Sequence, residues 1–327
     1  ADLDYDGDLG AFSSNHQDST TRSSHGTKCA EIIVDIAPQV ELYLYSFRGD
    51  VAFRNLIDHI IAQELDIMSM SLGWTAVGWH DGSSDISLKI DELRSKGILP
   101  VLSAGNSGIR HWDGVFVDND EDTFHDFYEN DNALVIGTSP GHRSDVILHW
   151  NDWSSDSVRD YDLWVVGVDS SGNQIERFSS DAQVQVGAQP PRERIGFEAR
   201  EGLRYSILIS GDKVSPALED AHLEIFVFRA SILEYPMAAG SISIPADAKG
   251  AIAVGAVNHE NDELASYSSR GPTKDGRIKP DVSGPTGVSV SGGRFGGTSA
   301  AAPHVAGLAA LLLSANLELS ADHLQDL

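Results

Sequence analysis

The first third of the chain alternates between two hydrophobic periods. Segments with apolar residues at helical spacing are separated by short apolar runs that are typical of buried strands. The predicted helices are 25–38, 51–64 and 85–96, and the predicted strands are 40–47, 65–72 and 98–103, with a further strand at 251–257. Such alternation predicts an α/β fold with a parallel sheet and right-handed crossovers. A site is then expected at the carboxyl ends of the strands.

The pattern changes between residues 113 and 246, where short strand-like runs follow one another without helical spacing. Asp169–Asn173 has the composition of a hairpin turn. Several short strands separated by turns predict a β-sandwich. We therefore expect an inserted all-β domain at 113–246 between two parts of one core, 1–112 and 247–327. Its predicted strands are 133–138, 146–150, 161–168, 194–199, 204–209 and 223–228.

A loop-to-helix junction near the end of the chain carries a candidate nucleophile. Gly296-Gly297-Thr298-Ser299 precedes a long apolar run, and Pro303 is tolerated there only because it lies near the helix start. Helix N–H groups favour negative charge at this position. Ser299 therefore suits an attack that creates an oxyanion, although a plain N-cap role is the alternative.

Three blocks, in this order, resemble the subtilisin-like serine proteases (subtilases). They are Ser24-His25-Gly26-Thr27, Ser103-Ala104-Gly105-Asn106-Ser107-Gly108 and the segment Gly296–Gly307. The resemblance implies a subtilisin-like three-layer core around a parallel sheet. Asp160–Val165 likewise resembles a strand of the small jelly-roll domains that accompany secreted proteases, so the insert is expected to be jelly-roll-like.

The resemblance also implies roles for individual residues. Ser299 would be the nucleophile, His25 the general base and Asn106 the side-chain amide of the oxyanion hole. The substrate would lie against two segments, Ser71-Leu72-Gly73 and Ser103-Ala104-Gly105. The expected reaction is hydrolysis of peptide bonds in proteins or peptides through an acyl-enzyme, with no cofactor for catalysis.

Two other readings of these residues compete with the endopeptidase. One is a catalytically dead relative that acts as a binding protein through its inserted domain. The other is an esterase of the α/β-hydrolase kind, which requires Gly-x-Ser-x-Gly and a histidine after the serine. Ser299 stands in Gly-Thr-Ser-Ala-Ala, and His304 follows it by only five residues. We reject the esterase.

The resemblance does not extend to the third member of the catalytic triad, an aspartate. In subtilases this aspartate ends a hydrophobic strand well upstream of the His-Gly-Thr block. The 24 residues before His25 are polar and form no such strand. We expect the aspartate to lie upstream of Ala1, and none of the early acidic residues is nominated in its place.

An acidic loop heads the predicted insert. Its carboxylates occupy positions 1, 3, 5, 9 and 12 of an EF-hand-like loop, which predicts a structural calcium ion. Threonine replaces the glycine expected at position 6, and a solvated acidic loop is the alternative. The five predicted ligands are Asp118, Asp120, Asp122, Asp126 and Glu129.

Composition limits the classes of partner that the protein is expected to bind and bears on its cellular compartment. The 49 acidic residues outnumber the 23 basic ones, giving a net charge of −26, so nucleic acid and anionic membrane surfaces are not expected to bind. Because 41% of the residues are hydrophobic, the charge does not imply disorder. The single cysteine, Cys29, excludes an intrachain disulfide and leaves the compartment open. Family resemblance, rather than composition, favours an extracellular enzyme.

The charge also predicts that the protein tolerates or requires high salt. Repulsion among acidic side chains destabilises a compact state and is screened as ionic strength rises. We expect the melting temperature to rise from low to molar salt, as in a protein from a salt-adapted organism. A melting temperature that stays constant or falls would contradict this expectation.

Overall fold

The computed structural model describes residues 24–153, 159–180, 190–211 and 221–326, which divide into two compact units. Among these residues, the first unit contains 24–74, 80–105 and 242–326. The second contains 75–79 and the described parts of 106–241.

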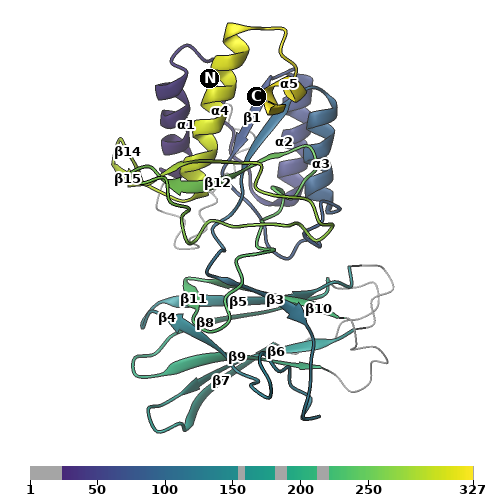
Figure 1. Cartoon of the computed structure of the whole chain (residues 1–327), viewed down its shortest axis with the longest axis vertical. Coiled ribbons are helices and arrows are strands. Elements are labelled where there is room, and N and C mark those ends of the chain that lie inside the picture. Colours follow the sequence, from purple (N-terminus) through teal and green to yellow (C-terminus); the bar gives the residue numbers. More distant parts are fainter. Residues whose placement is uncertain (1–23, 154–158, 181–189, 212–220, 327) are drawn as a thin grey trace. The chain divides into compact units, whose positions relative to one another are not determined.

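The first unit is built on a parallel four-stranded sheet (Figure 1). Every neighbouring pair is parallel, and all five residues of β2 are buried, as expected for a sheet covered on both faces. In spatial order the strands are β1 (Ile67–Met70), β2 (Leu99–Ser103), β12 (Ile252–Asn258) and β13 (Val282–Thr286).

Helices pair on the two faces of this sheet (Figure 1). Helix α4 contacts all four strands and packs against α1, whereas α3 contacts β2 and packs against α2. A small hairpin, β14 (Val288–Val290) and β15 (Gly293–Phe295), precedes α4. The helices are α1 (His25–Ile36), α2 (Gly49–Ala62), α3 (Asp85–Ser95), α4 (Thr298–Ala315) and α5 (Ala321–Asp326).

The helices and strands predicted for this unit are confirmed, with one exception. Residues 40–47 have no regular secondary structure, so the predicted strand there is wrong. The segment lines a cavity of about 1250 Å³, and β1 lines it as well. A strand requires neighbours for its backbone hydrogen bonds, and no described strand pairs with this segment.

Helix α4 is apolar and packs unusually close to α1. A Cβ atom on Gly307 would lie 3.0 Å from Cβ of Ile36, so a larger residue would require Ile36 or one of the helices to shift. By length and hydropathy α4 could cross a membrane. Its contacts with α1 and with the whole sheet are instead those of a core helix, although Leu308 and Leu311 on its outer side are exposed.

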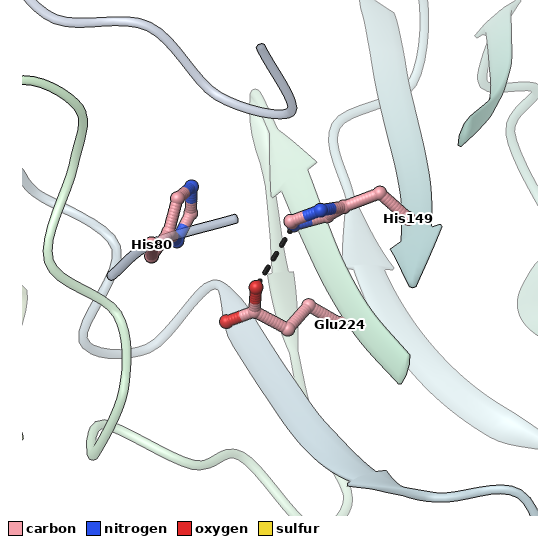
Figure 2. A group of neighbouring side chains, drawn as sticks. All are labelled: His80, His149 and Glu224. Atoms are coloured by element: carbon pink, nitrogen blue, oxygen red, sulfur yellow. Dashed lines mark ion pairs between the residues drawn. The ribbon is translucent and has the colours of Figure 1, made fainter. Parts of the chain in front are cut away.

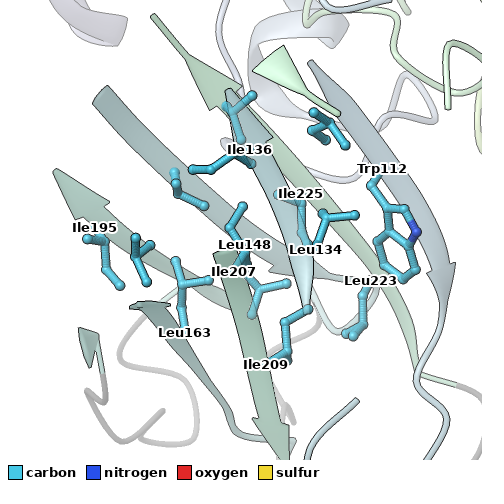
Figure 3. Close-up of a cluster of buried hydrophobic side chains, with 14 of the residues drawn as sticks. Trp112, Leu134, Ile136, Leu148, Leu163, Ile195, Ile207, Ile209, Leu223 and Ile225 are labelled. Atoms are coloured by element: carbon cyan, nitrogen blue, oxygen red, sulfur yellow. The ribbon is translucent and has the colours of Figure 1, made fainter. Parts of the chain in front are cut away.

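The second unit contains two antiparallel sheets. Residues of the first sheet, such as Leu148 and Ile225, and residues of the second, such as Leu163 and Ile207, form one hydrophobic core (Figure 3). The first sheet has the order β3 (His111–Val115), β10 (His222–Phe228), β5 (Arg143–Trp150) and β8 (Arg192–Glu198). The second has the order β11 (Ala230–Ile232), β4 (Leu134–Thr138), β9 (Arg204–Gly211), β6 (Tyr161–Val168) and β7 (Gln174–Ser180).

All six strands predicted in this region are present, and Asp169–Asn173 is the turn between β6 and β7. Gly172 adopts φ 83° in that turn. The sequence did not predict β3, β7 and β11. Strand β7 lies at a sheet edge and buries none of its residues fully, so it lacks the apolar alternation of a half-buried strand.

Candidate active site

Ser299 lies in the first turn of α4, and the backbone before it is fixed by side chains from two other segments. Gly297 adopts φ 90°, a conformation that favours glycine. Its N–H donates to Tyr267 Oη at 3.1 Å, and its carbonyl accepts from Thr286 Oγ1 at 3.1 Å. Because the Thr286 hydrogen is used in this way, Tyr267 Oη donates to Thr286 Oγ1 at 2.9 Å. This closed set of bonds sets where the helix begins.

His25 is the first residue of α1 and is partly buried. The edge of its ring meets the Phe295 ring, with 5.4 Å between the ring centroids. Burial lowers the pKa of His25, and the nearby Lys28 ammonium lowers it further. The imidazole therefore stays neutral to a lower pH than a free histidine, which is the state that accepts a proton.

Cys29 connects the two helices at this point. Its sulfur lies 4.0 Å from His25 Nδ1 and 3.5 Å from the carbonyl oxygen of Ser299. Cys29 therefore lies on the same face of the helix as His25, as expected for residues four positions apart. Burial raises the pKa of the thiol to about 11. The structure therefore brings the starts of α1 and α4 together, with a protonated thiol between them.

Ser299 is also bonded to the segment that follows β1. Ser71 Oγ donates to the Ser299 carbonyl at 3.0 Å, and Ser299 Oγ donates to the Ser71 carbonyl at 3.5 Å. The second distance is at the limit of a hydrogen bond, so the Ser299 hydroxyl is held weakly. A weakly held hydroxyl can reorient when a substrate binds.

The predicted substrate segment Ser103–Gly105 follows β2 and uses its backbone groups within the protein. Ala104 N donates to Val254 O, and Ala104 O accepts from Ser243 N. Gly105 N donates to Thr298 Oγ1 at 3.2 Å, next to the candidate nucleophile. These groups are occupied, so Ala104 would contact a substrate through packing rather than through backbone hydrogen bonds. Sequence reasoning missed the role of Thr298 in holding this segment.

The other predicted substrate segment, Ser71-Leu72-Gly73, leads into Trp74. A Cβ atom on Gly73 would lie 3.0 Å from the Ile244 carbonyl oxygen, so the close approach requires glycine. Trp74 N donates to the same oxygen at 2.7 Å. Its indole ring packs against Phe47 and Phe53, with centroids 5.9 and 5.1 Å away. Trp74 is therefore anchored in an aromatic cluster.

Asn106, the predicted oxyanion donor, immediately follows Gly105 and belongs to the second unit by its contacts. Its role stays a prediction. His304, the histidine considered for an esterase, lies in α4, and its Nδ1 donates to the Ala300 carbonyl at 2.7 Å.

The cavity described above lies beside the candidate base, His25. Its lining includes His25, Cys29 and Ser71 together with the irregular segment 39–47 and the end of α4. It therefore reaches the same ends of α1 and β1 that hold the Ser299 region.

The acidic loop of the second unit gathers three of its five predicted ligands. One carboxylate oxygen from each of Asp118, Asp120 and Asp126 lies within 4.8 Å of the others. Thr123, at the position expected to be glycine, adopts φ 81°, so the tight turn forms despite its side chain. Asp122 instead accepts from Asn132 Nδ2. The side chains of Asp122 and Glu129 are not part of this group.

These features are those of a known protein family. A parallel α/β unit with a serine and a histidine at the starts of two packed helices is the architecture of subtilisin-like proteins. The chain belongs to the subtilase family, whose profile matches residues 4–192 and 231–327.

Individual relatives share shorter stretches. Bacillopeptidase F of Bacillus subtilis is 40% identical over 100 residues, which is 28% of this chain and 7% of that protein. Serine protease AprX of the same organism is 35% identical over 114 residues, 27% of this chain and 26% of that protein. The chain thus spans a small part of these relatives. The CspB protease of Clostridium perfringens has a similar fold, with a TM-score of 0.55 at 20% identity over 82% of this chain and 60% of that one.

Proposed function

We propose that the protein is a serine endopeptidase that hydrolyses peptide bonds of protein substrates through an acyl-enzyme. The observation that carries this proposal is the contact of Cys29 with both His25 and the Ser299 carbonyl, at 4.0 and 3.5 Å. It brings a nucleophile and a base to one place on two helices.

In the proposed reaction, Ser299 Oγ attacks the scissile carbonyl while His25 takes its proton. The resulting imidazolium gives that proton to the leaving amine, and water then hydrolyses the acyl-enzyme by the reverse sequence. The Ser299 N–H and the Asn106 amide would stabilise the oxyanion. Removal of one such donor typically raises the barrier by about 2.7–4 kcal/mol, a range measured in subtilisin.

A fluorophosphonate distinguishes this function from that of an inactive relative. An activated serine forms a covalent adduct with this reagent, whereas a plain helix-capping serine does not. We expect stoichiometric labelling of Ser299 in the protein that contains this chain. A folded protein that is not labelled would favour a binding role for the second unit.

We further propose that the triad carboxylate reaches His25 from the side of this cavity. In a serine triad this carboxylate holds the imidazole through the nitrogen that does not face the nucleophile. The 1250 Å³ cavity is lined by His25 and by two chain segments, 39–47 and 66–72. Replacement of a candidate aspartate by asparagine tests this proposal. A variant that keeps full activity would exclude that aspartate as the triad carboxylate.

The proposed function also includes a role for the second unit in the architecture and an extracellular location. We propose that the second unit is an inserted β-sandwich domain, because its two antiparallel sheets share one core. We also propose an extracellular setting, with proteins or peptides as substrates and no binding to nucleic acid or membranes, which suits the net charge of −26.

Lys28 is expected to set the acidic limit of activity. Burial and the Lys28 charge both lower the pKa of His25, whereas the proposed triad carboxylate would raise it, so the quantity to compare between variants is the pH of the acidic limb of the kcat/KM profile. Lys28→Gln removes one of the two causes, so the pKa rises and the limb moves to higher pH. The control is Lys96→Gln at the end of α3. An identical limb in Lys28→Gln and wild type would contradict the expectation.

Calcium is expected to stabilise the second unit through the acidic loop. An ion that binds only the folded state raises its apparent stability. We therefore expect EGTA to lower the melting temperature and added Ca²⁺ to restore it. Asp120→Asn should reduce this shift, because Asp120 is one of the three clustered carboxylates. A melting temperature that changes with neither EGTA nor Ca²⁺ would contradict this expectation and favour a solvated acidic loop.

A further inference from the structure

One face of the first sheet of the second unit carries a buried set of histidines and carboxylates. Glu224 on the central strand β10 lies directly opposite Asp113 on β3 and His149 on β5. His111 and His222 lie two residues from Asp113 and Glu224 along their strands, so they lie on the same face. The side chains of His111, His149 and Glu224 are 0% exposed.

These side chains form two linked groups. His111 Nε2 lies 3.1 Å from Glu224 Oε1, and His149 Nε2 lies 3.0 Å from Glu224 Oε2; Figure 2 shows the second pair. His222 Nε2 pairs with Asp113 Oδ1. One ligand atom each from His111, Asp113 and Glu224 lies within 4.8 Å of the others.

The His111 ring is held in the orientation of a metal-binding histidine. Its Nδ1 lies 2.8 Å from the Met237 carbonyl oxygen, which can only accept, so Nδ1 carries a hydrogen. The Nε2 atom then faces a carboxylate oxygen of Glu224 in a buried setting, where a second ring proton or a metal ion supplies the positive charge that the carboxylate requires. Metal-binding histidines commonly donate their other N–H to a carbonyl in this way.

We propose that the second unit binds a divalent first-row transition metal, with Zn²⁺ as the first candidate, through His111 Nε2, Asp113 and Glu224. Water would complete the coordination. In a tetrahedral site with bonds of about 2.0–2.1 Å, neighbouring ligand atoms lie about 3.3 Å apart, close to the 3.1 Å between His111 and Glu224. Imidazole disfavours Ca²⁺, which takes six to eight oxygen ligands.

The two remaining histidines hold the ligands rather than the metal. His222 hydrogen-bonds Asp113, which is how outer contacts orient ligating carboxylates, and His149 Nε2 lies 3.0 Å from the second oxygen of Glu224. The side chains of Asp113 and His222 are 13% and 36% exposed, which gives the ion a path into the site. The bound ion would join β3 to β10. These ligands belong to the second unit, whereas His25 and Ser299 belong to the first, and the proposal does not rest on protease activity.

Titration with Co²⁺ tests the site, in the full chain carrying Ser299→Ala so that self-digestion cannot interfere. After removal of metal by a chelator, we expect one Co²⁺ per chain, with the strong visible absorption of a four- or five-coordinate ion. Zn²⁺ should displace it, and excess Ca²⁺ should not. A folded protein that binds neither Co²⁺ nor Zn²⁺ would overturn the proposal.

Variants assign the binding to these residues. Glu224→Gln and Asp113→Asn should weaken binding by more than about 100-fold, whereas His149→Gln and His222→Gln, which change outer contacts, should weaken it by about 10–100-fold. His142→Gln is the matched control, because His142 also donates Nδ1 to a carbonyl but is exposed.

Circular dichroism of each metal-free variant establishes that it is folded. If Glu224→Gln does not fold, the more exposed Asp113→Asn decides the question. Binding in a folded Asp113→Asn variant that equals that of wild type would overturn the assignment.

Discussion

Replacing Ser299 with alanine should lower kcat by about 10⁶-fold while leaving the protein folded, the scale found when the triad serine of subtilisin is removed. Within the described part of the chain, the Ser299 side chain makes one long hydrogen bond, 3.5 Å to the Ser71 carbonyl, so little stability is lost with it. Peptide hydrolysis and circular dichroism on the same preparation measure both quantities. A purified Ser299→Ala protein that keeps its activity would end the serine-protease proposal.

His25→Ala should reduce turnover to a similar extent, and combining it with Ser299→Ala should add little. Residues that act as one catalytic unit have strongly non-additive effects. His304→Gln is the matched control, because His304 lies in the same helix but bonds only to the Ala300 carbonyl among its described contacts. It should keep most of the activity.

Mercuric ion should abolish activity through Cys29, the second large effect that we expect. The sulfur lies between His25 Nδ1 and the Ser299 carbonyl, so an ion bound to it displaces the imidazole from the nucleophile. Because burial raises the pKa of the thiol to about 11, anionic alkylating reagents should react slowly. Activity assays with each reagent measure this contrast.

The controls for this prediction are Cys29→Val and peroxide. The valine variant should be active and should resist mercuric ion. Peroxide should spare the wild type, since Ala300 rather than a methionine follows the nucleophile, and Met68 and Met70 of β1 are buried. A wild type insensitive to mercuric ion, or an equally sensitive Cys29→Val enzyme, would show that Cys29 does not lie beside the catalytic histidine.

Hydrophobic period alone predicted most helices and strands, because each buries one face against a neighbour. It failed at residues 40–47, where the composition is that of a strand but no described strand is a partner. It failed also at the exposed edge strand β7. The pairing of a strand and the burial of its side chains depend on the rest of the fold. A local sequence pattern therefore cannot predict them.

The proposed catalytic residues could be predicted because each lies in a contiguous block that resembles the family. The residues that hold them could not. Tyr267, Thr286 and Gly297 come together only through the sheet and the loop before α4. The buried histidines and carboxylates correspond to two short sequence patterns, His-x-Asp at 111–113 and His-x-Glu at 222–224. Only the antiparallel register shows that these pairs are neighbours.

The glycine contact between α1 and α4 has a consequence for how activity is lost. The two helices carry His25 and Ser299 at their first turns, and Gly307 meets Ile36 two to three turns further along. The alignment of the proposed base and nucleophile therefore depends on a packing contact away from both side chains. A side chain at 307 would require Ile36 or one of the two helices to shift by a few tenths of an ångström. We expect Gly307→Ala to lower activity while the sheet stays folded.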